Sequence, residues 1–460
     1  MRKRVVFISI LIGLLFFLNS SQYLSWFYIL ASSYETTYVD FVGQVLGKLF
    51  QAIGIIAFSL YVRYSPKRPQ RITEFACLIA ASFMLTVLTL SPPFADFCPI
   101  IGLLMNIAIG ALYGLYVSYI IDVVPSCHYG LSFGLGIGIS CILSYLLYAL
   151  DKDYSFMMSV SCLYFYGLLS FIIVLFIMMH QSMITEDITD EKADIIDDSL
   201  DINTRFNYST SNIILISTLF VLISITYALG YFVPAEDISA FHISVEVMRL
   251  MYFVGLVLAG FLNDKSRKYG FILCLITLTF AFSMPLIRDN PTGVYVAWMI
   301  SYFMGGFITV CRAIFFTDIA QSTGKLYLAP MGVAIGRTAE PIGMILRLHF
   351  ESDHSILLFV ISFFFAVTII FFVAVYSKLY LRQPEIASID YHSVFADRYK
   401  LSSREIEILD EILDIKSNKE IAARLFITES TVKFHVKNLM KKTGCKNRNE
   451  LIKLYNEKKL

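Results

Sequence analysis

The sequence predicts an all-α protein, in which a polytopic membrane bundle of about 12 transmembrane helices, six and six, is followed by a small four-helix domain. Composition is the first observation behind this prediction. The 460 residues are 57% apolar and 16% charged, against roughly 45–50% and 25% in typical globular proteins. Distribution is the second. Long apolar runs fill the chain to about residue 380, and short, lysine-rich amphipathic patterns follow them.

The first apolar run begins after Met1-Arg2-Lys3-Arg4 and continues to about Ala31. This is too long for the apolar region of a signal peptide, so we expect a retained first span. Later runs of sufficient length to cross a bilayer lie near residues 38–62, 72–91, 97–121, 130–150, 155–180, 212–233, 245–263, 270–287, 294–317, 328–348 and 355–380. Each of them predicts one membrane-spanning helix.

The charges of the short loops predict the orientation of these spans. If the chain crosses the membrane at each span, the basic loops share one side, which the positive-inside rule makes cytoplasmic. Those basic residues are Arg2, Lys3, Arg4, Arg63, Lys67, Arg68, Arg71, Lys265, Arg267, Lys268, Lys325, Lys378 and Arg382. The opposite side is mainly acidic. We therefore expect a multi-pass cell-membrane protein, in contact with the lipid bilayer, whose N-terminus and C-terminal domain are both cytoplasmic.

An acidic cytoplasmic loop at 181–211 divides the expected membrane domain, 1–381, into halves at 1–180 and 212–381. A solvated linker is the preferred interpretation of this loop, and a docking surface for the basic C-terminal domain is the alternative. A linker at 382–397 then leads to the C-terminal domain, 398–460.

Small residues and one loop relate the two halves to each other. Gly130, Gly134 and Gly138 recur every four residues in one span, and Gly332 and Gly336 do so six spans later, so close helix approach is expected at both places. The loop Gly260-Phe-Leu-Asn-Asp-Lys-Ser-Arg-Lys268 is similar to the signature loop of the major facilitator superfamily. The corresponding loop from Tyr61 to Arg68 keeps the basic residues but lacks the Gly and Asp. The resemblance implies two six-helix bundles with a central cavity.

Ionisable residues inside membrane spans usually face a cavity or a partner, because exposing them to lipid costs free energy. Lys48, Arg337 and Glu340 are the best placed, and we expect them to line a cavity between the halves that binds a polar or anionic small molecule. Alternatively, Arg337 and Glu340 pair with each other on one helix face. Snorkelling or gate-type pairing is expected for residues nearer the span ends, which are Asp122, Arg249, Arg312 and Asp318. Aromatic residues that could contribute to the cavity are Trp26, Tyr113, Tyr116, Tyr119 and Trp298. For the two tryptophans, anchoring at the membrane interface is an equally good explanation.

Residues 401–451 predict four short helices whose starts are marked by caps. Capping boxes are expected from three pairs, which are Ser402 with Glu405, Ser417 with Glu420, and Asn447 with Glu450. The second helix, from Asn418 to Phe426, meets the third across Ile427-Thr428-Glu429, and Thr428 can cap that third helix. So short a turn predicts a helix-turn-helix.

The third of these helices has two unlike faces. Its packing face is expected to hold Val432, His435, Val436, Leu439 and Thr443. Its outward face holds Lys433, Phe434, Lys437 and Lys441, with Lys442 beside them. Three lysines and an aromatic on one exposed stripe are expected of a helix that lies in the major groove of DNA.

The segment SNKEIA, followed by TVKFHVKNLMKKTG and KNR, resembles the LuxR-type DNA-binding domain of bacterial transcription regulators. The resemblance covers roughly the last sixty residues, and it implies three kinds of contact with double-stranded DNA or a partner copy. Base-edge contacts fall to Lys433, Phe434 and Lys437, phosphate contacts to Asn418, Lys419 and Thr431, and dimerisation to the helix from Arg448 to Glu457. The sequence departs from the family pattern at Ile415, where Gly is usual, and at Thr443, where an apolar residue is usual.

No catalytic motif is apparent in the sequence, so we expect no enzyme, no cofactor and no metal site. The eight cysteines form no CxxC pair and no metal-ligand spacing. The prediction is a membrane-bound one-component regulator that senses a small molecule through its membrane domain and acts as a homodimer on DNA. The alternative is a transporter with an attached regulatory DNA-binding domain.

Overall fold

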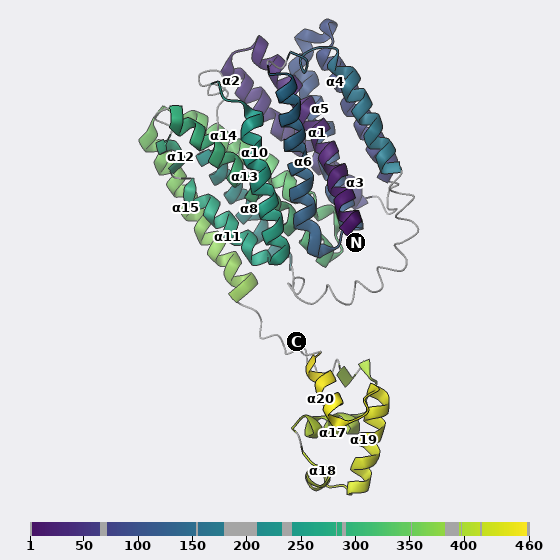
Figure 1. Cartoon of the computed structure of the whole chain (residues 1–460). Helices are drawn as coiled ribbons and strands as arrows, with labels where there is room; N and C mark the ends of the chain where they lie inside the picture. Colours follow the sequence, from purple (N-terminus) through teal and green to yellow (C-terminus); the bar gives the residue numbers. More distant parts are fainter. Residues whose placement is uncertain are drawn as a thin grey trace. The chain divides into compact units, whose positions relative to one another are not determined.

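The computed structural model of the chain describes residues 2–64, 71–152, 155–178, 209–231, 242–281, 283–287, 291–350, 352–381, 395–396, 398–414 and 416–457. These residues form helices and connecting turns with no strand, and they divide into two compact units, Met1–Ser377 and Lys378–Leu460 (Figure 1). The predicted all-α class is therefore confirmed. The acidic loop expected at 181–211 lies almost wholly outside the described residues.

The first half of the membrane unit consists of long helices joined by short turns. Its elements are α1 (Arg2–Ser33), α2 (Thr36–Val39), the π-helical η1 (Asp40–Leu46), α3 (Gly47–Tyr64), α4 (Arg71–Leu90), η2 (Pro92–Phe97), α5 (Cys98–Val123), η3 (Ser126–His128), α6 (Tyr129–Leu150) and the helix Cys162–Met178. The second half repeats the pattern. Its elements are α8 (Thr210–Tyr231), α10 (Val245–Lys265), α11 (Arg267–Phe280), α12 (Ser283–Leu286), α13 (Pro291–Thr323), η5 (Leu326–Leu328), α14 (Met331–Phe350), α15 (His354–Tyr376) and η6 (Ser377–Leu381).

Within the described residues, nine of these helical segments are long and apolar enough to cross a membrane. The other three expected spans are also helical, but each departs from the simple pattern. The span near 155–180 is the shorter helix Cys162–Met178, the span near 270–287 is divided between α11 and α12, and the span near 328–348 is α14, which carries several charges. The multi-pass bundle predicted from hydropathy is thus present.

The two halves meet along α6 with α10 and along α3 with α14. At the first contact, glycine lets two backbones touch. A Cβ added to Gly134 would lie 2.4 Å from the carbonyl oxygen of Leu256, and one added to Gly130 would lie 2.3 Å from that of Gly260. These distances are too short for any side chain larger than hydrogen. The close approach expected from the glycine repeat of α6 therefore occurs, and it joins the halves.

The loop between α10 and α11 forms hydrogen bonds and an ion pair with α6 and α13 at one end of this bundle. The Asp264 carboxylate accepts hydrogen bonds of 2.7 Å from the backbone N–H groups of Gly130 and Leu131 at the start of α6. Arg267 pairs with Asp318 of α13 at 2.7 Å, so the expected gate-type pairing of Asp318 is found. On the equivalent loop of the first half, Arg63 lies over the ring of Tyr327, 5.3 Å from its centroid. This end of the bundle is held by contacts across both halves.

The second unit is a small helical domain built around one apolar core. Its helices are α17 (Ser403–Leu413), α18 (Asn418–Arg424), α19 (Glu429–Thr443) and α20 (Arg448–Glu457). The core joins all four of them through Ile408, Leu409, Ile421, Val432, Leu439 and Leu451, which are fully or nearly fully buried. Four helices around one core match the predicted domain.

The caps explain where these helices start. The capping boxes of Ser402 with Glu405 and of Ser417 with Glu420 are both complete. Thr428 caps α19 by accepting from the Thr431 N–H at 3.2 Å. The third predicted box was only half right. Asn447 accepts from the Glu450 N–H, but the Glu450 carboxylate accepts from the N–H of Lys446.

The end predicted for the second helix was also wrong. The helix α18 stops at Arg424, two residues earlier than expected, because the chain turns sharply and Phe426 takes a left-handed φ of 55°. A helix cannot continue through that conformation. The turn leaves the Phe426 side chain 95% exposed.

Candidate functional site

The exposed face of α19 is the first candidate site. Lys433, Phe434, Lys437 and Lys441 are all exposed, while Val432 and Leu439 of the same helix are buried in the core. Lys433 pairs with Glu429 one turn earlier at 3.2 Å, and both side chains stay at least half exposed. An exposed pair of this kind is weak and can exchange for a phosphate. The face therefore presents cations and one aromatic ring to solvent, as predicted.

Three predicted phosphate contacts flank this face. Lys419 is exposed in the first turn of α18. The Thr431 hydroxyl lies 2.7 Å from that of Thr428, so it is held near the N-terminus of α19. The Asn418 side-chain oxygen accepts from Arg448 of α20 at 2.8 Å, and burial lowers the pKa of that arginine. The helix-turn-helix and α20 are thus linked directly through a predicted DNA-binding residue.

Lys442, which we expected beside the cationic stripe, has another role. Its ammonium group lies 2.6 Å from the Glu405 carboxylate and 2.8 Å from the Lys400 carbonyl oxygen. Burial alone would raise the pKa of Glu405, but hydrogen bonds from Lys442 and Ser402 outweigh it and hold that pKa below its usual value. Lys442 therefore links α19 to α17, and the Glu405 carboxylate partly neutralises its charge.

The two departures from the family pattern have different outcomes. The Thr443 hydroxyl donates to the Leu439 carbonyl oxygen at 2.9 Å, so the polar group is satisfied within its own helix. Ile415 lies outside the described residues.

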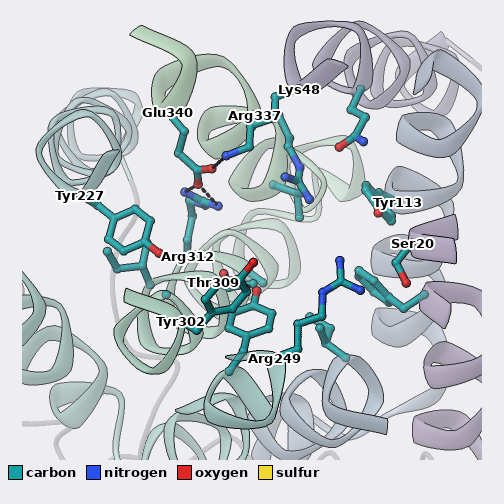
Figure 2. A pocket seen from close by; sticks show the side chains of 18 of the residues that line it. Ser20, Lys48, Tyr113, Tyr227, Arg249, Tyr302, Thr309, Arg312, Arg337 and Glu340 are labelled. Carbon is teal, nitrogen blue, oxygen red and sulfur yellow. Dashed lines mark hydrogen bonds and ion pairs between the residues drawn. The ribbon is translucent and has the colours of Figure 1, made fainter. Parts of the chain in front are cut away.

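A cavity of about 340 Å³ between the halves of the membrane unit is the second candidate site. Its walls come from α1, α3, α5 and α6 of the first half and from α8, α10, α13 and α14 of the second. All three residues predicted to bind a ligand, Lys48, Arg337 and Glu340, line it (Figure 2). This volume falls within the range of roughly 300–1,000 Å³ typical of small-molecule sites.

Glu340 is the centre of the ionic network in this cavity. One carboxylate oxygen lies 2.9 Å from the Lys48 ammonium group, and the other lies 3.3 Å from the Arg312 guanidinium (Figure 2). Arg312 also donates to the Ser224 hydroxyl at 2.7 Å. Since Lys48 belongs to α3 and Glu340 to α14, this ion pair crosses from one half to the other. The alternative, that Arg337 and Glu340 pair with each other, does not describe these contacts.

Arg249 and Arg312 were both expected near span ends. Arg249 does lie near the start of α10, but Arg312 lies well inside α13. Both line the cavity. Arg312 is central because α13 runs from Pro291 to Thr323, beyond both limits of the apolar run that predicted it. Gly336 makes room for its side chain, since a Cβ there would lie 2.0 Å from an Arg312 nitrogen. The helix continues past the end of its apolar run, and this extension moves Arg312 away from the helix end. A helical pattern continuing beyond residue 317 is the signal that could have identified Arg312.

Aromatic side chains cover much of the remaining wall. Tyr113 and Tyr116 line the cavity as expected, and the Arg337 guanidinium lies 5.6 Å from the centroid of the Tyr113 ring. Tyr119, Trp26 and Trp298 do not line it. Both tryptophans are packed inside the protein, with at most 2% of their surface exposed, so interfacial anchoring does not describe them either. Among the described residues, no group of His, Cys, Asp or Glu could hold a metal ion.

Comparison with known proteins identifies the class of the second unit. Residues 399–455 match the family described as bacterial regulatory proteins, luxR family. This region is 54% identical over 52 residues to the uncharacterized transcriptional regulatory protein YhcZ of Bacillus subtilis, or 11% of this chain and 24% of YhcZ. It is 40% identical over 58 residues to the spore germination protein GerE of the same organism, or 13% of this chain and 78% of GerE. The class is that of DNA-binding transcription regulators.

Through this domain the chain belongs to the luxR family of bacterial regulatory proteins. Its helix-turn-helix unit is accordingly a DNA-binding unit, with the cationic face of α19 exposed. The match with YhcZ spans only about a quarter of that protein's length, and the membrane unit lies outside both matches.

The fold of the membrane unit matches that of transporters. The human organic anion transporter MFSD10 superposes with a TM-score of 0.57 at 13% identity, over 80% of this chain and 99% of that protein. The proton:xylose symporter XylE does so with a TM-score of 0.51 at 14% identity, over 82% of this chain and 95% of XylE. The membrane unit therefore has the major facilitator fold, and the chain is a multi-pass membrane protein. Neither this fold nor the luxR domain is typically enzymatic.

Proposed function

We propose that this protein is a one-component transcription regulator that senses a small molecule in its membrane cavity and controls transcription by sequence-specific DNA binding. One observation carries the proposal. A single polypeptide contains both a luxR-family DNA-binding domain and a major facilitator bundle whose cavity is lined by charged residues from both halves. Charges inside a membrane bundle are costly unless they serve a site.

The ion pair of Lys48 with Glu340 supports a sensing mechanism that relies on movement of the halves. Because the pair crosses the seam, a ligand that enters the cavity changes the balance between states in which the halves are close or apart. The last span and the linker near 382–397 then pass this change to the domain at 398–460. A ligand shifts the population only by as much as its affinities for the two states differ.

On DNA, we assign base-edge contacts to Lys433, Phe434 and Lys437 and phosphate contacts to Asn418, Lys419, Thr431 and Lys441. The proposed partner is a second copy of the chain, joined through α20. One helical module buries only about 600–1,000 Å² on DNA, so a pair of modules on half-sites roughly one helical turn apart is needed for tight binding.

The test uses the full chain in lipid nanodiscs and genomic DNA fragments from its host. Bound fragments are sequenced with and without a library of small molecules, and the operator is then footprinted. We expect a subset of compounds to change operator occupancy. Lys437→Ala should weaken specific occupancy but keep ligand binding, and Arg337→Gln should weaken ligand binding but keep specific occupancy. Occupancy that no compound changes, in a protein that does bind compounds, would contradict the sensing role.

A transporter with an attached regulatory domain is the second candidate function. The fold favours it, because MFSD10 is an organic anion transporter and XylE a proton:xylose symporter. Uptake of a bound compound into sealed vesicles, lost in Arg337→Gln, would support this candidate. Ligand-dependent operator occupancy without uptake would support the sensor.

A further inference from the structure

Among the described residues that line the cavity, cations outnumber carboxylates. Lys48, Arg249, Arg312 and Arg337 contribute four cations, and Glu340 is the one carboxylate among the described lining residues. Glu340 is already shared between Lys48 and Arg312. Among the described residues, no carboxylate forms an ion pair with Arg337, whose guanidinium lies over the ring of Tyr113. The described lining residues therefore carry a formal excess of three positive charges, and Glu340 does not offset the charge of Arg337 through a direct ion pair.

Arg249 and Arg337 extend toward the same region of the cavity. In Figure 2 the Arg249 side chain rises from α10 and the Arg337 side chain descends from α14, and both guanidinium groups point toward the middle of the site. Arg249 also donates to the Ser144 hydroxyl at 3.4 Å. Two guanidinium groups that face one opening are matched by a planar anion, because a carboxylate accepts paired hydrogen bonds from arginine.

The wall beside these arginines is aromatic and belongs to the first half. The rings of Phe16 and Tyr113 are stacked with centroids 5.1 Å apart, and the Tyr116 ring meets Phe16 edge-on at 4.8 Å. All three residues line the cavity, with Ser20 beside them. Such a wall favours a flat apolar group, since aromatic rings pack well in offset or edge-on contact.

We propose that the cavity binds an organic carboxylate with a planar apolar body. Its carboxylate lies between Arg249 and Arg337, and its flat body packs against Phe16, Tyr113 and Tyr116. This assignment of ligand class rests on the sensing role proposed above. It also gives the ligand a mechanical effect, because the acidic end is held by the second half and the flat body by the first. A ligand of this class therefore draws the two halves together.

The experiment measures binding to the full chain in nanodiscs by calorimetry, with probes that separate charge from shape. The acidic probes are benzoate, phenylacetate and 3-phenylpropanoate. Their comparators are the neutral 3-phenylpropanamide, the cationic 3-phenylpropylammonium and propanoate, which lacks the ring. We expect at least one acidic aromatic probe to bind, and to bind at least about tenfold more tightly than any comparator.

Variants locate the site. Arg337→Gln and Arg249→Gln should each weaken binding of the acidic probe by about tenfold to a hundredfold, the range expected for loss of a charged hydrogen bond. Arg337→Lys should keep part of the affinity, because it retains the charge but loses the planar fork. The matched control is Lys152→Gln, an exposed basic residue outside the cavity, which should change nothing.

The proposal is overturned if no acidic probe binds, if the amide or the ammonium compound binds as tightly as the carboxylate, or if Arg337→Gln binds normally. Footprinting on the same samples separates this proposal from the sensing role. Carboxylate binding that leaves operator occupancy unchanged removes the sensing role and keeps the ligand class. Occupancy that responds only to neutral or cationic compounds removes the ligand class and keeps the sensing role.

Discussion

Lys437 lies at the middle of the exposed face of α19, where a base edge would be met. We expect Lys437→Ala to weaken binding to the specific operator by about 1–3 kcal/mol and to relax the sequence preference at one position. Lys441→Ala is the matched comparison, because a lost phosphate contact should weaken all sequences alike and reduce the salt dependence. Quantitative footprinting at several salt concentrations distinguishes the two. A uniform loss in Lys437→Ala would reassign that residue to phosphate.

Glu405 makes the stability of the DNA-binding unit sensitive to acid. Its pKa is lower in the folded unit than in the unfolded chain, so its contribution is present above the unfolded pKa and is lost as pH falls through the folded value. The contribution is about 1 kcal/mol, since Lys442 is partly exposed to solvent. Glu405→Gln should lose that amount at pH 7 and flatten the decline below about pH 4.

Urea unfolding of residues 378–460 at several pH values measures this effect. Residues within this unit match 78% of GerE, which supports using the unit alone. Glu407→Gln is the control, because the Glu407 side chain is 48% exposed and its pairing with Arg404 is at the surface. An equal loss in both variants would refute a special role for Glu405.

Substitutions at Gly336 and Arg312 should have non-additive effects on the stability of the membrane unit. Gly336→Ala places a Cβ against the Arg312 guanidinium, which Glu340 and Ser224 hold in place. We expect a loss of about 1–3 kcal/mol in the stability of the membrane unit. In an Arg312→Ala background the same change should cost far less, because the obstructing group is gone. Thermal unfolding in nanodiscs of the wild type, both single variants and the double variant gives the coupling. Additive losses would contradict the contact.

Among the elements, the seam of α6 with α10 gives the sharpest prediction. Gly134→Ala would bring a methyl group within 2.4 Å of the Leu256 carbonyl oxygen, so the two helices must separate. We expect a loss of about 1–3 kcal/mol in stability. Leu146→Ala on the same helix, where the side chain is 52% exposed, should cost little in comparison. Thermal unfolding in nanodiscs measures both. Equal losses would mean that the close contact at Gly134 contributes little to stability, because helix propensity alone would favour alanine over glycine.

Local chemistry explains which elements were predicted well. The caps at Ser402, Ser417 and Thr428 need only residues within one turn, so the sequence contains all of the information. The end of α18 depends instead on the left-handed turn at Phe426, a conformation that residues other than glycine rarely adopt. Glu340 shows the same limit in the membrane unit. Its partners are Lys48 and Arg312, which lie 292 and 28 residues away, and not the neighbouring Arg337.

At the scale of the whole molecule, the charges of the loops and the function of the DNA-binding unit require the same topology. A DNA-binding domain acts on DNA in the cytoplasm, and the positive-inside rule predicts from the basic loops that the C-terminal side lies there. We expect a C-terminal epitope to resist protease added to intact spheroplasts and to be digested once they are permeabilised. An epitope inserted after Asp353, in the turn before α15, is the control and should be digested in both cases. Digestion of the C-terminal epitope in intact spheroplasts would contradict this orientation.

Composition and periodicity were sufficient to divide the chain into a membrane bundle and a small helical domain. Helices of the first are predominantly apolar along their whole length, whereas helices of the second are apolar on one face only. The cavity was predictable only in part. Lys48, Arg337 and Glu340 stand out because they interrupt apolar runs, whereas Arg249 and Arg312 were assigned to span ends. Whether these two arginines reach the cavity depends on helix length and on where the halves separate. Neither can be inferred from the hydropathy of a single segment.

The glycine contacts between α6 and α10 have a kinetic consequence. Where main chains touch directly, few rotamers have to exchange when one bundle rolls over the other, so friction along this line is small. The speed of a response would then be limited by how quickly the bound compound leaves. We therefore expect the response to decline as fast as the bound compound dissociates when its external concentration falls, whatever the length of the earlier exposure.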